Sequence, residues 1–383
     1  MKRLKKNILL IFGTRPEAIK LCPLVKELQR HSEEFSTTVC VTGQHRKMLD
    51  QVLKVFDVVP KYDLHLMTDN QTLESLTSAC LSKIMEVLKI EKPDLVIVQG
   101  DTTTTFTGSL AAFYSKIKVG HVEAGLRTNN RYSPFPEEMN RKMTTCLADY
   151  HYAPTLTNKQ NLLKEGVSDE SIVITGNTVI DALLWVRDKL RKEKPNFAQL
   201  KDINFDKKVI LVTGHRRENF GEGFQNICAA IKKIAESYND IEIVYPVHLN
   251  PNVRKPVNAI LAGISNIKLI DPLEYEPFVY LMDKSYFIIS DSGGIQEEAP
   301  SLGKPVLVTR NTTERPEAVE AGAIKLVGVD KDDIFNAAKT LLNDSVVYNV
   351  MATSKNPYGE GDACEQIVES ISKYISIESH HVS

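Results

Sequence analysis

Short apolar runs alternate with segments of helical period along most of the chain. The first run, residues 7–12 (NILLIF), has the length and composition of a buried strand. Residues 16–29 then carry apolar side chains at helical spacing, with Pro16 near the first turn. Further strands are predicted at 37–42, 94–99, 117–122, 207–213, 241–247, 267–270, 286–290 and 305–309. This alternation predicts an α/β fold with parallel sheets and crossover helices.

The pattern of the first residues recurs in the middle of the chain. Residues 207–214 (KKVILVTG) repeat the strand and glycine of residues 5–13, and a basic turn and a helical segment follow both. The repeat predicts two doubly wound, Rossmann-like domains that face each other across a cleft.

The domain boundaries follow from this repeat. We place the N-terminal domain at 1–176 and the C-terminal domain at 177–360. The helical segment at 361–383 is expected to cross back to the first domain. The charged stretch 187–206 is expected to be the loosest part of the chain and to lead into the second domain.

Composition and charge exclude several classes of protein. The 383 residues suit two domains of about 150 residues or more. With 47 Lys and Arg against 49 Asp and Glu, the net charge of −2 argues against a general nucleic-acid or membrane surface. The apolar run at 8–12 is too short for a signal peptide, and the closest cysteines, Cys22 and Cys40, lie 18 residues apart. A reducing, cytoplasmic location is therefore expected.

The common cofactor motifs are incomplete. The stretch that starts at Gly221 begins like a dinucleotide fingerprint but has Asn226 at its sixth position, and Lys304 is followed by Pro305 where a phosphate loop needs Ser or Thr. No HExxH motif or paired histidine spacing is present. A nicotinamide enzyme, an ATPase and a zinc hydrolase are disfavoured, and no metal or cofactor is predicted.

Charged residues follow the predicted strands, where open α/β sheets bind ligands. Arg15 and Lys20 follow the first strand, Asp101 and Glu123 follow the strands at 94–99 and 117–122, and His215 follows the strand at 207–213. Each of them alone is equally consistent with a helix cap or a surface ion pair, and Asp101 is a plausible N-cap. Their common position at strand ends favours a functional site.

The stretch 290–299 (SDSGGIQEEA) is the strongest local signal. Gly293 and Gly294 allow backbone N–H groups to approach an anion at a helix start, and Glu298 is placed to accept hydrogen bonds from ribose hydroxyls. Arg315 follows the next strand and supplies a partner for phosphate. The alternative is a tight turn followed by two solvated carboxylates, Glu297 and Glu298.

Glu137 begins a predicted helix after Pro136. Acidic residues complement the dipole of a helix start, which explains the position without any chemistry. The alternative is that Glu137 joins Asp101 and Glu123 in the cleft. Three carboxylates near a bound phosphate ester repel one another, which makes proton exchange near neutral pH possible.

Several motifs, in the same order along nearly the whole chain, resemble one known family. The chain resembles the non-hydrolysing UDP-N-acetylglucosamine 2-epimerases, most closely those of the enterobacterial type, at Phe12–Lys20, Gly100–Thr104, His121–Arg127, Pro134–Glu138, Thr175–Asn177, Gly214–Asn219, Asp291–Gly294 and Arg315–Glu317. The resemblance implies a glycosyltransferase-B-like fold and a homodimer. It also implies interconversion of UDP-N-acetylglucosamine and UDP-N-acetylmannosamine for surface-polysaccharide synthesis, by elimination of UDP to a 2-acetamidoglucal and re-addition, without metal or nicotinamide.

The resemblance also implies roles for individual residues. The catalytic group would comprise Asp101, Glu123, Glu137 and His215. Substrate would be bound by Arg15, Lys20, Asp101, Glu123, His215, Leu273, Phe278, Ser292, Gly293, Gly294, Glu298 and Arg315. Leu273 stands where close relatives have Gln, so recognition of uracil there would rest on the main chain or be weaker. The spacing does not decide which carboxylate is the base and which is the acid.

Some members of the family are activated by a second molecule of UDP-N-acetylglucosamine. The resemblance places that site at Gln44, His45 and His248, but Lys47 and Asn70 depart from the Gln and Arg of the regulated type. His248 is equally consistent with an ordinary loop histidine. Two other functions are open alternatives: a glycosyltransferase, which shares the fold but needs an acceptor and one catalytic base instead of three acids, and a catalytically idle sensor of nucleotide sugars.

Overall fold

The first of two parallel sheets has seven strands in the order β3-β2-β1-β4-β5-β6-β7. The computed structural model describes residues 5–43, 46–66 and 71–381. This sheet lies in unit 1, Met1–Ala182 with Tyr358–Ser383. Its elements are β1 (Lys6–Phe12), α1 (Arg15–Arg30), β2 (Phe35–Val41), α2 (Arg46–Val55), β3 (Tyr62–Asp63), α3 (Leu73–Glu91), β4 (Leu95–Gln99), α4 (Thr103–Tyr114), β5 (Lys118–Val122), α5 (Glu137–Leu147), β6 (Tyr150–Ala153), α6 (Leu156–Lys164), β7 (Ile172–Ile174), the start of α7 (Thr178–Glu193) and α15 (Ala363–His381).

The second sheet has six strands in the order β10-β9-β8-β11-β12-β13, again all parallel. It lies in unit 2, Leu183–Pro357, so the division between the units falls within α7. Its elements are β8 (Lys208–Thr213), α8 (Glu222–Ser237), β9 (Ile241–Pro246), α9 (Pro251–Leu261), β10 (Ile267–Ile270), α10 (Tyr275–Lys284), β11 (Phe287–Ser290), α11 (Gly293–Glu298), β12 (Val306–Val308), α12 (Pro316–Glu320), β13 (Ile324–Leu326), α13 (Lys331–Asn343) and α14 (Ser345–Ala352).

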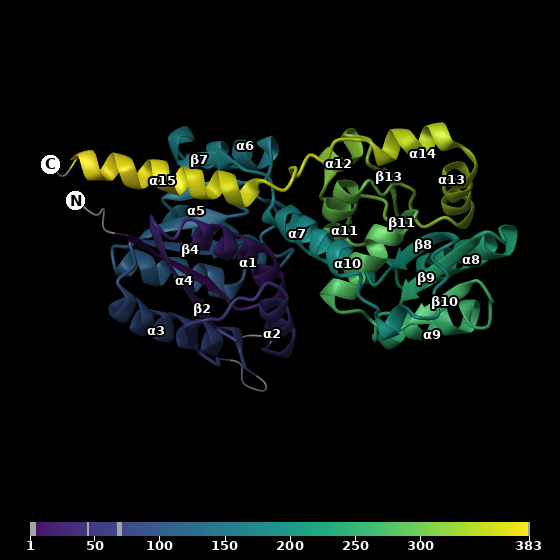
Figure 1. Ribbon diagram of the computed structural model, residues 1–383, viewed down its shortest axis with the longest axis horizontal. Helices are drawn as coiled ribbons and strands as arrows, with labels where there is room; N and C mark the ends of the chain where they lie inside the picture. The colour runs from purple at the N-terminus through teal and green to yellow at the C-terminus, as the bar shows by residue number, and fades with distance from the viewer. Residues whose placement is uncertain (1–4, 44–45, 67–70, 382–383) are drawn as a thin grey trace. The chain divides into compact units, whose positions relative to one another are not determined.

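Burial explains the apolar runs. The side chains of residues 8–12 in β1 are completely buried, as expected for a central parallel strand with helices on both faces. Each buried Leu, Ile or Phe contributes about 1.5–3 kcal/mol by leaving water. In unit 1 the C-terminal helix α15 packs against α1, and Figure 1 shows the two helices side by side. In the described ranges no helix combines the length and the hydropathy that a membrane span requires.

The order of strands fixes where each unit can bind a ligand. β1 pairs with β2 on one side and β4 on the other, and β8 pairs in the same way with β9 and β11. The connections leave in opposite directions at these points, which opens a crevice at the carboxyl ends of the two central strands. The loops after β1 and β4 in unit 1, and after β8 and β11 in unit 2, therefore border these crevices.

The predicted fold class, two Rossmann-like α/β units of the glycosyltransferase-B type, is confirmed, and the sequence missed four short strands. These are β3, β6, β7 and β13, of two to four residues each, which are too short to give a periodic signal. The prediction of loose chain at 187–206 was wrong for residues 187–193, because α7 continues as a helix to Glu193. Ion pairs on its polar face, such as Arg191 with Asp283 on α10, explain the charged composition that suggested a linker.

Candidate active site

A buried carboxylate connects the loops after β1 and β4, which border the crevice of unit 1 (the switch point of its sheet). Glu17, in the first turn of α1, accepts hydrogen bonds through Oε2 from the backbone N–H groups of Gly13 and Thr14, at 3.1 and 2.8 Å. Its Oε1 accepts from the hydroxyls of Thr102 and Thr105 in the region after β4, at 2.7 and 3.2 Å. Burial raises the pKa of this carboxyl, and the hydrogen bonds oppose the shift. Sequence reasoning missed Glu17, although Thr14 and Glu17 have the spacing of a capping box.

Glu123 is held by three side chains from different segments. The ammonium group of Lys20 on α1 lies 2.6 Å from both carboxylate oxygens, Gln99 at the end of β4 donates to Oε2, and Asn177 donates to Oε1 at 3.3 Å. Glu123 also has a left-handed backbone, with φ of 63°. A non-glycine residue persists in that conformation only where its surroundings impose it, and such positions gather at functional sites. Asn177 ends one of the motifs of the family resemblance and Gln99 belongs to none of them, and nothing in the sequence shows that either meets Glu123.

Asp101 forms an ion pair with Arg141 on α5, whose Nε lies 2.9 Å and Nη2 2.6 Å from Oδ2. Asn140 donates to the backbone carbonyl of Asp101 at 2.9 Å. The N-cap of α4 is Thr102, so the interpretation of Asp101 as a helix cap was wrong. Arg141 also pairs with the buried Glu138 at 3.0 Å.

Glu137 and Glu138 at the start of α5 have different surroundings. Glu138 accepts the backbone N–H groups of Thr128 and Asn129, both at 3.0 Å, and thereby holds the preceding loop. Glu137 lies one helical turn before Arg141 and so on the same face of α5. Arg141 is the residue that pairs with Asp101. Within the described chain its buried Oε2 has no hydrogen-bond partner. Native proteins rarely leave a buried carboxylate oxygen in this state, which marks Glu137 as a group placed for a ligand.

Two further residues complete this edge of unit 1. Arg15 is the first residue of α1 and is partly exposed, beside the loop that Glu17 braces. His121 on β5 is fully buried, and its Nε2 lies 2.8 Å from the carbonyl oxygen of Gly100, in the loop before Asp101. Burial lowers the pKa of His121 to about 3, so this imidazole is neutral near pH 7 and has a structural role.

In unit 2 a second buried carboxylate shapes the loop after β8. Asp291, which directly follows β11, accepts the backbone N–H groups of His215 and Arg216, at distances of 2.8–3.2 Å. The His215 ring stacks on the His248 ring with 5.3 Å between their centroids. Burial lowers the pKa of His215, the charges of His248 and Arg216 lower it further, and the Asp291 carboxylate opposes them. The predicted role of His215 thus rests on a residue that sequence reasoning left unassigned, Asp291.

The glycines after β11 lie against an arginine. A Cβ on Gly293 would lie only 3.0 Å from Cζ of Arg315, so this position needs glycine if the guanidinium is to stay in place. Arg315 pairs with Glu297 through Nε and Nη2, at 2.9 and 2.8 Å, and with Glu314 through Nη1 at 2.7 Å. Glu297 is buried, so its interpretation as a solvated carboxylate was wrong.

The remaining predicted residues of unit 2 lie on neighbouring loops. Ser292 is the N-cap of α11, and its backbone N–H donates to the hydroxyl of Ser290 at 3.0 Å. Glu298 is the last residue of α11 and is partly buried. Leu273 follows β10, Phe278 lies in α10, and both are partly buried. Among the described residues, no group of three or more His, Cys, Asp or Glu side chains has the arrangement of a metal site.

Only part of the predicted second nucleotide-sugar site can be placed. Gln44, His45 and Asn70 lie outside the described residues. His248 accepts a hydrogen bond at Nδ1 from the backbone N–H of Asn250, at 3.1 Å, as the loop-histidine interpretation expects. Its stacking on His215 links it to the catalytic candidate.

Comparison with known proteins identifies the family. The family model described as UDP-N-acetylglucosamine 2-epimerase matches residues 26–372. The chain belongs to the UDP-N-acetylglucosamine 2-epimerase family. It is 58% identical to the UDP-N-acetylglucosamine 2-epimerase of Escherichia coli K12 over 371 residues, which cover 95% of this chain and 98% of the relative. It is 56% identical to the Campylobacter jejuni enzyme of that name over 381 residues, with 98% and 99% covered.

Solved structures of epimerases have the same fold. The Neisseria meningitidis UDP-GlcNAc 2-epimerase bound to UDP-GlcNAc is 52% identical, has a TM-score of 0.85 and covers 96% of this chain and 100% of its own. The Methanocaldococcus jannaschii epimerase in complex with UDP-GlcNAc and UDP is 36% identical, with a TM-score of 0.76 and 96% and 99% covered. A glycotransferase of kitacinnamycin, 10% identical with a TM-score of 0.62, shares the fold alone.

Membership of the epimerase family decides between the functions that the sequence left open. The protein is an isomerase that epimerises UDP-N-acetylglucosamine, of the non-hydrolysing type. The glycosyltransferase shares with it only the architecture, at an identity that carries no functional argument. The family resemblance of the motifs at the strand ends is therefore confirmed.

Proposed function

We propose that the protein interconverts UDP-N-acetylglucosamine and UDP-N-acetylmannosamine, with unit 2 holding the UDP and unit 1 supplying the acid and the base. The observation that carries the proposal is the difference between the two switch points. In unit 1 the loops bring forward carboxylates, Asp101 and Glu123, each paired with a cation. In unit 2 the guanidinium of Arg315, from the loop after β12, lies over a backbone without a side chain at Gly293, in the loop after β11.

The reaction needs both sets of groups. One carboxylate removes the proton from C2 while the bond between C1 and the UDP oxygen breaks. The electron pair of the C–H bond becomes the C1=C2 double bond of 2-acetamidoglucal, and UDP leaves as an anion. Because the C2 proton is not adjacent to a carbonyl, its removal depends on stabilisation of the charge on the departing diphosphate. A second carboxylate then gives a proton to the opposite face of C2, and the UDP oxygen bonds to C1 again.

The surroundings of the carboxylates support these roles. Glu123 and Asp101 are oriented by Lys20 and Arg141, whereas Glu137 keeps a buried oxygen with no partner in the described part of the chain. Glu137 is therefore available to a substrate proton without first breaking a hydrogen bond. The roles of base and acid are shared among these three side chains.

The diphosphate and the uridine would be held by the other predicted residues. Arg315 and the partly exposed His215 supply hydrogen-bond donors of the kind that a leaving diphosphate needs, together with Arg15 and Lys20. The backbone of Ser292, Gly293 and Gly294 would approach the phosphate oxygens, Glu298 would accept from the ribose, and Leu273 and Phe278 would line the uracil site.

Isotope exchange tests the reaction directly. In D2O, UDP-N-acetylglucosamine is expected to acquire deuterium at C2 in both epimers, read by nuclear magnetic resonance. Glu137→Gln is expected to lower the exchange rate by about 10²–10⁴-fold, the contribution of a proton-transfer group. Glu33→Gln, at an exposed carboxylate of the same unit, serves as the matched control. If neither deuterium nor the mannosamine epimer appears, the proposed reaction is wrong.

A second experiment tests the cradle in unit 2. UDP is expected to raise the melting temperature of the protein through mass action, and Arg315→Ala is expected to lose most of that gain. Lys232→Ala removes an exposed cation on α8 and is the control. An equal gain in the Arg315 variant would remove this residue from the phosphate site.

We further propose a homodimer in the cytoplasm that supplies surface-polysaccharide synthesis. All six cysteines are free thiols, five of them buried, which supports a reducing compartment. Sedimentation at micromolar concentration tests the dimer.

A further inference from the structure

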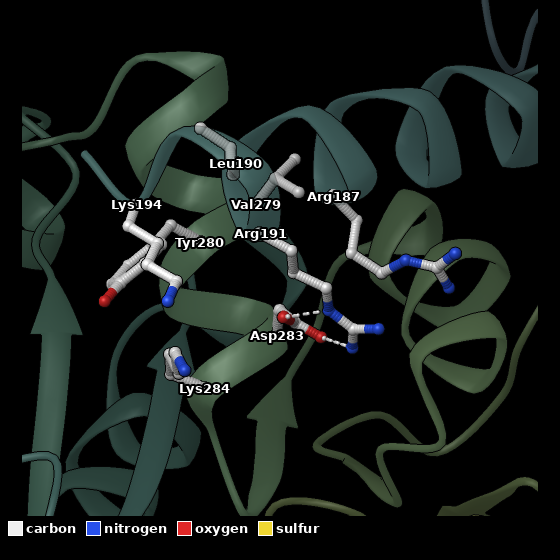
Figure 2. A pocket seen from close by; sticks show the side chains of 8 residues that line it. All are labelled: Arg187, Leu190, Arg191, Lys194, Val279, Tyr280, Asp283 and Lys284. Carbon is white, nitrogen blue, oxygen red and sulfur yellow. Dashed lines mark hydrogen bonds and ion pairs between the residues drawn. The ribbon is translucent and has the colours of Figure 1, made fainter.

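A pocket of about 250 Å³ in unit 2 uses none of the residues assigned to the epimerase site. It lies between the second half of α7 and α10 and is lined by Arg187, Leu190, Arg191, Lys194, Val279, Tyr280, Asp283 and Lys284. In Figure 2, Arg191 faces Asp283 on one side of the pocket, and Lys194, Tyr280 and Lys284 lie on the other.

Cations outnumber carboxylates in this pocket. Four of its side chains are cationic and one, Asp283, is acidic. Arg191 engages that carboxylate through two hydrogen bonds, with Nη2 and Nε at 2.7 and 3.1 Å. Lys194 and Lys284 form no ion pair with any residue that the structure describes. The Asp283 carboxylate is thus already occupied, and positive charge remains.

A fifth cation, Lys304, does not line the pocket but interacts electrostatically with three residues that do, Asp283, Arg191 and Lys284. Lys304 is partly buried, and its ammonium group forms no hydrogen bond or ion pair within the described ranges. Burial lowers its pKa, the charges of Arg191 and Lys284 lower it further, and Asp283 opposes them. A partly buried cation among other cations is costly unless an anion binds there.

The other wall of the pocket is apolar and fixed. The ring of Tyr280 is held edge-on by Phe197 and Phe205, with centroids 5.5 and 5.8 Å away, and Leu190 and Val279 are buried beside it. The ammonium group of Lys284 lies 5.8 Å from the centre of the Tyr280 ring. A ligand for this pocket therefore has an anionic group and a carbon portion that can cover the ring.

We propose that this pocket binds a small phosphorylated metabolite, with its phosphate at Lys194 and Lys284 and its carbon portion against Tyr280. A phosphate monoester carries a charge of about −1.5 to −2 and three acceptor oxygens. It can therefore pair with several separate cations at once, which suits this pocket better than a ligand with a single carboxylate. The volume of about 250 Å³ lies below the roughly 300–1,000 Å³ of pockets for drug-sized ligands, so a sugar phosphate fits better than a nucleotide. The ligand bridges α7 and α10, which Lys189 and Glu276 also join, at 2.9 Å.

Calorimetric titration with glucose 6-phosphate tests the pocket, with saturating UDP present to occupy the epimerase site. We expect saturable binding, weaker binding of inorganic phosphate and none of glucose. The double variant Lys194→Ala, Lys284→Ala is expected to bind about 100-fold more weakly, about tenfold for each ammonium group removed. Lys255→Ala, at an exposed lysine of α9, is the matched control and should bind as the unaltered protein does. Both replaced lysines are exposed, so the fold should be kept, which the melting curve checks.

Three results would overturn the proposal. The first is the absence of any binding tighter than about 1 mM. The second is equal affinity for inorganic phosphate, which would remove the role of Tyr280. The third is unchanged affinity in the double lysine variant, which would place the phosphate outside this pocket. None of these results depends on epimerase activity, so the pocket and the proposed reaction are tested separately.

Discussion

Replacement of Glu17 tests whether one buried carboxylate sets the geometry of the unit 1 site. Glu17 touches no predicted substrate residue directly, but it joins the loop that precedes Arg15 to the region after β4 that contains Asp101. In Glu17→Ala, two buried backbone N–H groups lose their acceptor, while the hydroxyls of Thr102 and Thr105 can rotate toward other partners, as Thr105 already donates to the Gln99 carbonyl at 2.6 Å.

The magnitude follows from those two N–H groups. An unsatisfied buried donor costs about 1–3 kcal/mol, so Glu17→Ala is expected to lose roughly 2–6 kcal/mol of unfolding free energy. That is a large part of the about 5–15 kcal/mol that stabilises a typical protein. In Glu17→Gln the amide oxygen can still accept both N–H groups, and its NH₂ group can donate to the threonine hydroxyl oxygens. We therefore expect a much smaller loss for the glutamine variant.

The pH dependence distinguishes the two variants further. Burial raises the pKa of Glu17 above its ordinary value of 4.5, so the folded state prefers the protonated form. A carboxyl with a raised folded pKa costs stability as pH rises from the unfolded pKa through the folded one. Glutamine is neutral throughout, so the stability of Glu17→Gln relative to the unaltered protein should improve as pH rises above about 4.5.

Urea unfolding at several pH values, followed by fluorescence and circular dichroism, measures both effects. Epimerase turnover is measured on the same samples, and kcat/KM is expected to fall in Glu17→Ala because the two loops lose their common brace. A loss below about 1 kcal/mol in Glu17→Ala would refute the reasoning, as it is smaller than the cost of one orphaned donor. A pH-independent difference for Glu17→Gln would show that the carboxyl does not titrate differently in the folded state.

Three further changes test other contacts. Gly293→Ala is expected to weaken UDP binding about tenfold in calorimetry, because its Cβ would lie 3.0 Å from Cζ of Arg315 and displace the guanidinium; unchanged affinity would contradict this. Gln99→Leu removes a hydrogen bond to Glu123 and is expected to lower kcat about tenfold with KM within about twofold, whereas a change in KM alone would assign Gln99 to substrate binding. His121→Gln is expected to make the free energy of unfolding depend less on pH in acid. The pKa of His121 is lowered from 6.5 to about 3, so the unaltered protein loses up to about 1.4 kcal/mol of that free energy per pH unit as pH falls through this range. If the free energies of unfolding of the two proteins fall equally as pH falls, His121 does not contribute to the acid sensitivity.

Several of the residues that the sequence predicted lie within three positions after an apolar run. Asp101 and Glu123 follow β4 and β5, and the end of a parallel strand is recognisable from the chain itself. Gln99 and Asn177 could not be found in this way, because their function depends on meeting Glu123 across 24 and 54 residues of chain. The fold class was predictable because burial on both faces makes each central strand continuously apolar.

The partner of a charge was harder to predict than the charge. Lys20 and Arg315 were assigned to the nucleotide, yet each makes an ion pair with a carboxylate of its own unit, Glu123 and Glu297. A sequence shows the sign of a side chain, whereas the folded chain decides what lies opposite it. The same limit explains the error at α7. Its charged residues suggested a linker, but they belong to a helix and form ion pairs with α10.

The repeat that the sequence showed extends to the way each unit holds its first loop. In unit 1 the carboxylate of Glu17 accepts two consecutive backbone N–H groups of the loop after β1, and in unit 2 that of Asp291 accepts two from the loop after β8. Both are buried, with exposed fractions of 1% and 0%. Glu17 reaches the loop from its own helix and Asp291 from the neighbouring strand, so the chain positions differ while the hydrogen bonding is the same. A buried acceptor for consecutive N–H groups fixes a loop without occupying its solvent side. Arg15, at the start of α1, and His215, in the loop after β8, therefore lie at loops of defined shape.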